Sequence, residues 1–150
     1  MNEIKPTQSI GTRQPLVDGP EKVSGRAIYS GDLLPNNCLV GRIFRSPVAH
    51  AEIIEVDVSA AAKLPGVKAV ITGDETDEPY GILPIARFEF PLARDKVRYR
   101  GEPIACVAAV DVETAQAAID LIKFRYNELP AYFSSKEATE DGVVNLHDHR

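Results

Sequence analysis

Ile104-Ala-Cys-Val-Ala-Ala-Val110 is an unbroken apolar run, and a helix and a strand are predicted directly after it. An apolar run without polar alternation is typical of a strand buried on both faces. Asp111 is the expected N-cap of the helix, because its carboxylate can accept free backbone N–H groups of the first turn. The apolar positions of this helix recur at helical spacing and form one stripe: Val112, Ala115, Ala118, Ile119 and Ile122. From Lys123 to Tyr126 the period is two, which predicts a second strand with Phe124 and Tyr126 facing inward.

A shorter pattern of strand, helix and strand precedes this module. A strand is predicted from Ala51 to Asp57, a short helix from Ala60 to Lys63 and a strand from Val67 to Thr72. The connection of about nine residues is shorter than a usual parallel crossover of about a dozen, so the relative direction of the two strands stays open. A further strand is predicted from Leu39 to Arg45, ahead of both modules.

The segments around the two modules have less regular patterns. Residues 1–25 are rich in turn-forming residues and are interpreted as an extended arm, residues 26–135 as the domain, and residues 136–150 as a C-terminal tail. Residues 73–95 show no period, and a loop of that length in a compact domain is often functional. The predicted fold is α+β, with one mixed sheet, two helices packed on it and an extended N-terminal arm.

Composition indicates an ordinary globular domain. The chain has 150 residues, 44% of them hydrophobic, and a formal net charge of -5, so nucleic acid and anionic membranes are not expected partners. No apolar run approaches the roughly 18 residues of a membrane span. The first residues lack the hydrophobic core of a signal peptide, and two cysteines do not make a disulfide framework. We therefore expect a cytoplasmic protein.

Catalytic and metal-binding motifs are not found in the sequence. It contains no phosphate-binding loop, no paired Cys-x-x-Cys and no nucleophile elbow. His147-Asp148-His149 has no third fixed ligand beside it, so a metal site is not expected there. His50 is interpreted as a buried structural histidine or a subunit contact rather than a catalytic group. No catalytic, cofactor-binding or metal-binding residue is therefore predicted.

Five motifs follow one another along most of the chain. They are DGxxKVxGxAxYxxD from Asp18, GRIxRSPxAHAxI from Gly41, DxSxAxxLPGVxAV from Asp57, VxYxGEPIA from Val97 and YxxLP from Tyr126. With these motifs the chain resembles the N-terminal α/β-hammerhead domain of the large subunit in the xanthine dehydrogenase and aldehyde oxidase family of molybdenum hydroxylases. The runs GILPIA and FPLARDKVRYRG, within residues 81–101, are most similar to the alpha subunit of 4-hydroxybenzoyl-CoA reductases in that family.

The resemblance implies a non-catalytic part of a catalytic assembly. The family's pterin-contacting loops and its catalytic glutamate lie C-terminal of this domain, and no residue here corresponds to them. The implied holoenzyme contains molybdopterin, [2Fe-2S] clusters and FAD, and the implied partners are the remaining molybdopterin-binding domains, an iron–sulfur subunit and a flavin subunit. We expect this chain to bind none of these cofactors and to be inactive as an oxidoreductase when alone.

Two loops are the expected contacts to a neighbouring domain or subunit, because loops on a rigid scaffold often make such contacts. They are Arg45 to Ala51 and Phe88 to Glu102, and the candidate contact residues are Arg45, Ser46, Pro47, His50, Phe88, Phe90, Arg94, Arg100, Gly101 and Glu102. An alternative function is a stand-alone binding module that holds an anionic ligand or a protein partner, since arginines lie beside large apolar residues in loop 81–95.

Overall fold

A computed structural model describes residue 11 and residues 13–76, 78–81 and 89–147 of the chain. The chain divides into two compact units, residues 1–36 and residues 37–150. In the first unit, α1 (Gly19–Val23) and a 3-10 turn, η1 (Ser30–Asp32), interrupt an otherwise irregular segment. None of the described residues in this unit is buried, so these residues form no core of their own.

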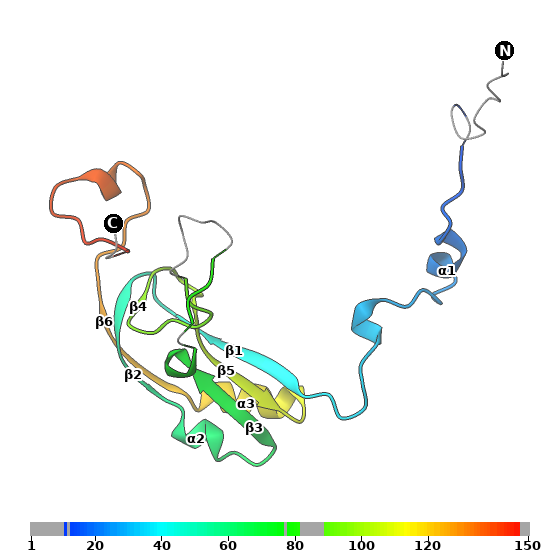
Figure 1. The fold of residues 1–150 in the computed structure, drawn as a ribbon, viewed down its shortest axis with the longest axis horizontal. Helices are drawn as coiled ribbons and strands as arrows, with labels where there is room; N and C mark the ends of the chain where they lie inside the picture. Colours follow the sequence, from blue (N-terminus) through cyan, green and yellow to red (C-terminus); the bar gives the residue numbers. More distant parts are fainter. Residues whose placement is uncertain (1–10, 12, 77, 82–88, 148–150) are drawn as a thin grey trace. The chain divides into compact units, whose positions relative to one another are not determined.

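The second unit contains two three-stranded sheets (Figure 1). The first, which we call the β5 sheet, has the order β1-β5-β3, with β1 Val40–Arg45, β5 Pro103–Ala109 and β3 Val67–Thr72. The second, the β2 sheet, has the order β4-β2-β6, with β4 Lys96–Val97, β2 Ala51–Asp57 and β6 Lys123–Glu128. The helices are α2 (Ser59–Ala62) and α3 (Val112–Asp120), and η2 (Gly73–Glu75) and η3 (Glu137–Thr139) are 3-10 turns.

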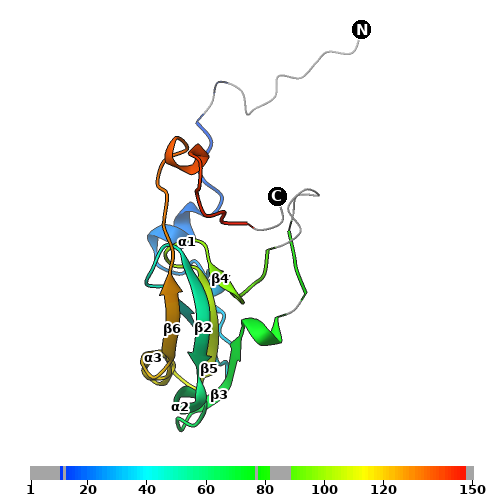
Figure 2. The same ribbon diagram turned by 90° about the vertical axis from the view of Figure 1, so that its left-hand side faces the viewer.

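Every strand pair in the two sheets is antiparallel. The α+β class is confirmed, but the expectation of one mixed sheet is wrong. Each strand, helix and strand module passes from one sheet to the other: β2, α2 and β3 form one, and β5, α3 and β6 form the other (Figures 1 and 2). The short connection through α2 agrees with this, because two parallel neighbours in one sheet need a longer crossover.

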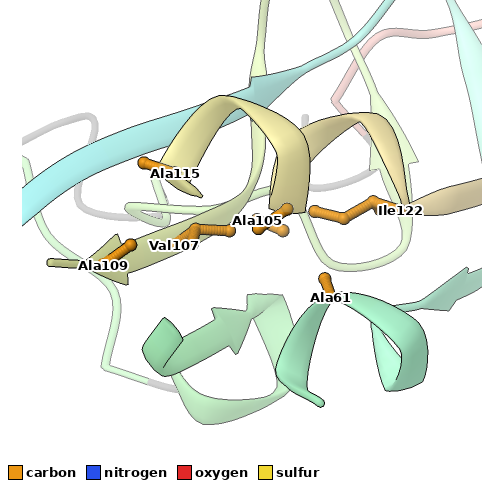
Figure 3. Close-up of a cluster of buried hydrophobic side chains, with 7 residues drawn as sticks. Ala61, Ala105, Val107, Ala109, Ala115 and Ile122 are labelled. Atoms are coloured by element: carbon orange, nitrogen blue, oxygen red, sulfur yellow. The ribbon is translucent and has the colours of Figure 1, made fainter. Parts of the chain in front are cut away.

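The main core lies where α3 and α2 pack against β5. Figure 3 shows Ala61 of α2, Ala105 and Val107 of β5 and Ile122, which follows α3, gathered in this layer. Alanine predominates in the cluster, so the helices can approach the sheet closely. The N-cap prediction is confirmed, because the Asp111 carboxylate accepts the N–H of Thr114 at 2.7 Å.

Val112 departs from the predicted apolar stripe of α3. Its side chain is 44% exposed, whereas Ala115 and Ala118 are fully buried. It is the first residue of the helix, beyond the turns that meet the sheet. A second cluster of Ala93, Val97 and Ile104 continues the core toward the β2 sheet.

Phe44 and Val56 join the two clusters, because each packs against both. Phe44 of β1 contacts both, and its ring meets the Phe124 ring edge-on, with centroids 6.1 Å apart. Phe124 in turn stacks on Tyr126 at 4.9 Å. Phe124 and Tyr126 are half-buried while Lys123 and Arg125 are exposed, which confirms the predicted alternation of β6.

Candidate interaction site

The two predicted contact loops meet at the start of β5. Their backbones form a reciprocal pair, in which the Ser46 N–H donates to the Glu102 carbonyl and the Gly101 N–H donates to the Ser46 carbonyl, each at 2.9 Å. The Arg45 guanidinium adds a third bond, to the Gly101 carbonyl at 2.9 Å. Gly101 has a φ of 92°, a conformation that glycine adopts without a steric penalty. We call residues 45–50 and 98–102 the loop junction.

Two of the candidate residues support the loop junction from inside. Ser46 is 4% exposed, and its hydroxyl donates to the Val48 carbonyl at 2.7 Å. His50 is 1% exposed, and its Nδ1 lies 2.6 Å from the Pro130 carbonyl oxygen. A carbonyl can only accept, so Nδ1 carries the proton in this bond. The interpretation of His50 as a buried, hydrogen-bonded histidine is confirmed, and its side chain attaches the segment after β6 to the start of β2.

The other candidate residues that the structure describes are exposed or half-buried. Arg45, Pro47 and Arg100 are exposed, and Gly101 is half-buried. These four present a surface that a neighbouring protein could contact. Phe88 lies outside the described residues. Phe90 is half-buried, and the Arg94 guanidinium carbon lies 5.1 Å from the centre of its ring.

A hollow of about 330 Å³ opens beside the loop junction, and the described residues that line it include Tyr80, Phe90, Arg94, Arg98, Tyr99 and Glu102. Glu102 accepts the backbone N–H of Arg98, and the guanidinium of Arg98 lies 4.0 Å from its carboxylate. Burial raises the pKa of Glu102, and the interactions with Arg98 oppose this only in part. Burial and the nearby Glu102 carboxylate also raise the pKa of Tyr99.

The charges that line this hollow nearly balance. Arg94 and Arg98 contribute two positive charges, and Glu89, Asp95 and Glu102 contribute three carboxylates. This near balance of charge, with Glu102 bonded to Arg98, favours a polar surface that holds its own loops in place. A strong anion site would need an excess of positive charge.

The C-terminal tail returns to the same hollow, which sequence reasoning missed. Lys96 Nζ donates to the Asn145 carbonyl at 3.2 Å, and Arg98 Nε donates to the Leu146 carbonyl at 3.0 Å. The Val144 N–H donates to the Tyr132 hydroxyl at 3.2 Å. Backbone carbonyls accept two of these three bonds, and carbonyls leave no mark in a sequence. The signal that the sequence offers is the group of arginines in and near loop 81–95. These arginines are equally consistent with a contact to a ligand or to another protein, so they do not predict a contact with the C-terminal tail of the same chain.

The described residues do not fit a metal or an iron–sulfur cluster. Within the part of the chain that the structure describes, no three His, Cys, Asp or Glu side chains come together to hold a metal ion. The whole sequence has two cysteines, whereas a [2Fe-2S] cluster needs about four protein ligands. Among the same described residues, no helix has the length and apolar character to cross a bilayer.

The fold defines the chain as an α/β-hammerhead domain, with two small antiparallel sheets joined by the two helical modules. Residues 24–130 match the family described as "Aldehyde oxidase and xanthine dehydrogenase, a/b hammerhead domain". The chain therefore belongs to this family.

Its relatives are much longer proteins. It is 38% identical over 133 residues to a probable xanthine dehydrogenase subunit of Bacillus subtilis (strain 168), covering 87% of this chain and 18% of that protein. It is 35% identical over 143 residues to the nicotinate dehydrogenase large molybdopterin subunit of Eubacterium barkeri, covering 95% of this chain and 34% of that protein. The chain thus spans about a third of these curated relatives or less.

Solved structures show the same fold at similar identity. Quinoline 2-oxidoreductase from Pseudomonas putida 86 superposes with a TM-score of 0.82 at 33% identity, covering 94% of this chain and 19% of that one. The aldehyde oxidoreductase from Desulfovibrio gigas superposes with a TM-score of 0.80 at 29% identity, covering 90% of this chain and 16% of that one.

Proposed function

We propose that this chain is the non-catalytic N-terminal scaffold domain of the large subunit of a molybdenum-dependent oxidoreductase. The observation that carries the proposal is the family match over residues 24–130. Domain boundaries at residues 26 and 135 fit this role, with residues 1–25 as an arm and residues 136–150 leading toward the molybdopterin-binding region.

The holoenzyme is proposed to act on an aromatic or heteroaromatic substrate. The relatives' names support this class, since they include a nicotinate dehydrogenase and a quinoline 2-oxidoreductase. Within the class, residues 90–101 favour a reaction like that of 4-hydroxybenzoyl-CoA reductases, in which a ring hydroxyl of an aromatic acyl-CoA is removed by reduction.

The cofactors of the proposed assembly belong to its other parts. Molybdopterin would lie in the remaining domains of the large subunit, [2Fe-2S] clusters in an iron–sulfur subunit and FAD in a flavin subunit. We place the assembly in the cytoplasm, where the two free cysteines stay reduced. The contribution of this chain is a rigid platform that presents the loop junction.

Complementation tests the proposal. The remaining domains of the large subunit and both partner subunits are supplied with and without this chain, and substrate-dependent reduction of an electron acceptor is measured. We expect activity only when this chain is present, and none from this chain alone. Equal activity without the chain would remove the scaffold role, and activity from the isolated chain would overturn the whole proposal.

Charge reversal at the exposed part of the loop junction separates assembly from chemistry. Arg45→Glu and Arg100→Glu are expected to lower the yield of the complex while complexes that do form keep normal turnover. Lys63→Glu is a matched control, because Lys63 is also exposed but lies near the opposite end of β2. Lost turnover in an intact, cofactor-loaded complex would instead place the altered arginine in the active site.

A stand-alone binding module is the second candidate, supported by Arg94 and Arg98 at the hollow. The carboxylates beside them weigh against an anionic ligand. Thermal stabilisation of the isolated chain by one anionic metabolite, with no molybdopterin-binding partner recovered by co-purification, would favour this module over the scaffold.

A further inference from the structure

The two faces of the β5 sheet differ sharply in their surroundings. One face packs against α3 and α2 through Ala105, Val107 and Ala109. The side chains on the other face follow from the strand register, because directly opposed residues of an antiparallel pair share a face. Ile43, Cys106 and Ile71 form one row across the three strands, and Gly41, Ala108 and Ala69 form the next. We call these six residues the open face.

The open face is apolar although much of it is accessible to solvent. Ile43 is 41% exposed and Ile71 is 40% exposed. A Cβ added at Gly41 would meet nothing within 4 Å, so this part of the surface is unobstructed. None of the six residues carries a charge. Leu39 and Val110, 45% and 46% exposed, continue the apolar surface at the end of the sheet.

The β2 sheet has charged residues where its strands face water. Its exposed positions include Glu52, Glu55, Lys123 and Arg125, and Arg125 pairs with Glu55 at 2.9 Å. The two sheets therefore differ in the chemistry of their exposed faces. Exposed apolar patches on a folded domain often mark sites of contact with another protein.

We propose that the open face is the docking surface for the remainder of the large subunit, an inference that rests on the proposed function. The length of chain outside this structure supports this occupant. The chain covers 16% of the Desulfovibrio gigas protein and 19% of the Pseudomonas putida protein, so more than four-fifths of each lies beyond it. An apolar element of that remainder fits the open face, since Gly41, Ala69 and Ala108 let a second layer approach the backbone closely.

A chimeric large subunit tests the docking surface. This chain replaces the matching region of the Bacillus subtilis relative, and the yield of purified, molybdopterin-loaded chimera is measured. Ile43→Lys and Ile71→Lys should each lower that yield about tenfold, because a lysine cannot be buried in an apolar interface without a partner. Ile54→Lys is the matched control, since Ile54 is a 54% exposed strand isoleucine of the β2 sheet, and it should change the yield less than about twofold.

The outcomes separate this inference from the proposed function. An unsubstituted chimera that takes up no molybdopterin would count against the scaffold role itself. An unsubstituted chimera that loads normally, with both open-face variants as productive as Ile54→Lys, would overturn the docking surface alone.

Cys106 provides a second readout that needs no destabilising variant. Maleimide labelling of this thiol is followed by mass spectrometry in the isolated chain and in the loaded chimera. We expect labelling at least about tenfold slower in the chimera, because the docked layer covers the thiol. Equal rates would refute the proposal. Protection in the isolated chain that depends on its concentration would assign the open face to a second copy instead, and would also refute it.

Discussion

Gly73→Ala should destabilise the domain because a methyl group has no room at this position. Gly73 is buried at the end of β3, and a Cβ there would lie 2.4 Å from the carbonyl oxygen of Ala93 and 2.9 Å from Arg94 Cγ. The carbonyl is held in place, since the Ala93 N–H donates to the Pro103 carbonyl at 2.7 Å. Ala93 and the neighbouring Leu92 are also buried, at 7% and 5% exposed.

The expected loss follows from these contacts. Overpacking of a well-packed site costs about 1–3 kcal/mol, and displacement of Ala93 would also break its hydrogen bond to Pro103, worth about 1 kcal/mol. The free energy of unfolding should therefore fall by about 2–4 kcal/mol, which corresponds to roughly 5–15 °C in Tm for a chain of this size.

Urea denaturation followed by circular dichroism measures this change. Gly41→Ala is the matched control, because a Cβ at Gly41 meets nothing within 4 Å. It should leave the free energy of unfolding unchanged or raise it by up to about 1 kcal/mol, since alanine is favoured over glycine within a strand. Equal midpoints for Gly73→Ala and Gly41→Ala would refute the close approach of β3 to Ala93.

Three further predictions use the same assay. Asp111→Ala should lower the free energy of unfolding at pH 7 through loss of the N-cap. Hydrogen bonds from Thr114 lower the pKa of Asp111, so this loss should shrink as the pH falls through that pKa, and a loss that does not change with pH would contradict the cap. Burial raises the pKa of Glu102, so the stability that its protonated side chain contributes is present at low pH and is lost as the pH rises through the raised pKa. The free energy of unfolding of Glu102→Gln should therefore rise relative to that of the native chain between pH 4 and pH 7. A difference that does not change with pH would exclude this effect. Phe124→Ala should lower the free energy of unfolding by about 3 kcal/mol, whereas Phe133→Ala should leave it unchanged because Phe133 is 85% exposed. Similar losses for the two variants would show that the contacts of Phe124 contribute little to stability.

Much of the local structure could be predicted from the sequence. Asp111 caps α3 by accepting the N–H of Thr114, so the two residues of this contact lie within one helical turn of each other. The alternation in β6 was equally readable, because neighbouring side chains of a strand point to opposite faces. The order of the family motifs also predicted the hammerhead domain, and the match over residues 24–130 confirmed it.

The candidate site was predicted only as two separate loops. Their meeting at the loop junction depends on backbone bonds between Ser46 and residues 101 and 102, and backbone N–H and C=O groups are common to nearly all residues. The burial of Ser46 and His50 likewise follows from packing. Sequence reasoning could not tell these supporting residues from the exposed Arg45 and Arg100 beside them.

Only the tertiary structure established which strands share a sheet. The modules β2-α2-β3 and β5-α3-β6 have patterns that a single mixed sheet would also produce, yet each passes between two antiparallel sheets. Strand pairing is a contact between segments far apart in the chain, as when Ile43, Cys106 and Ile71 align in one row. Hydrophobic periodicity reports which residues of a strand share a face. It carries no information about which strand lies alongside. Strands pair through backbone hydrogen bonds, and every residue except proline has the same backbone donor and acceptor.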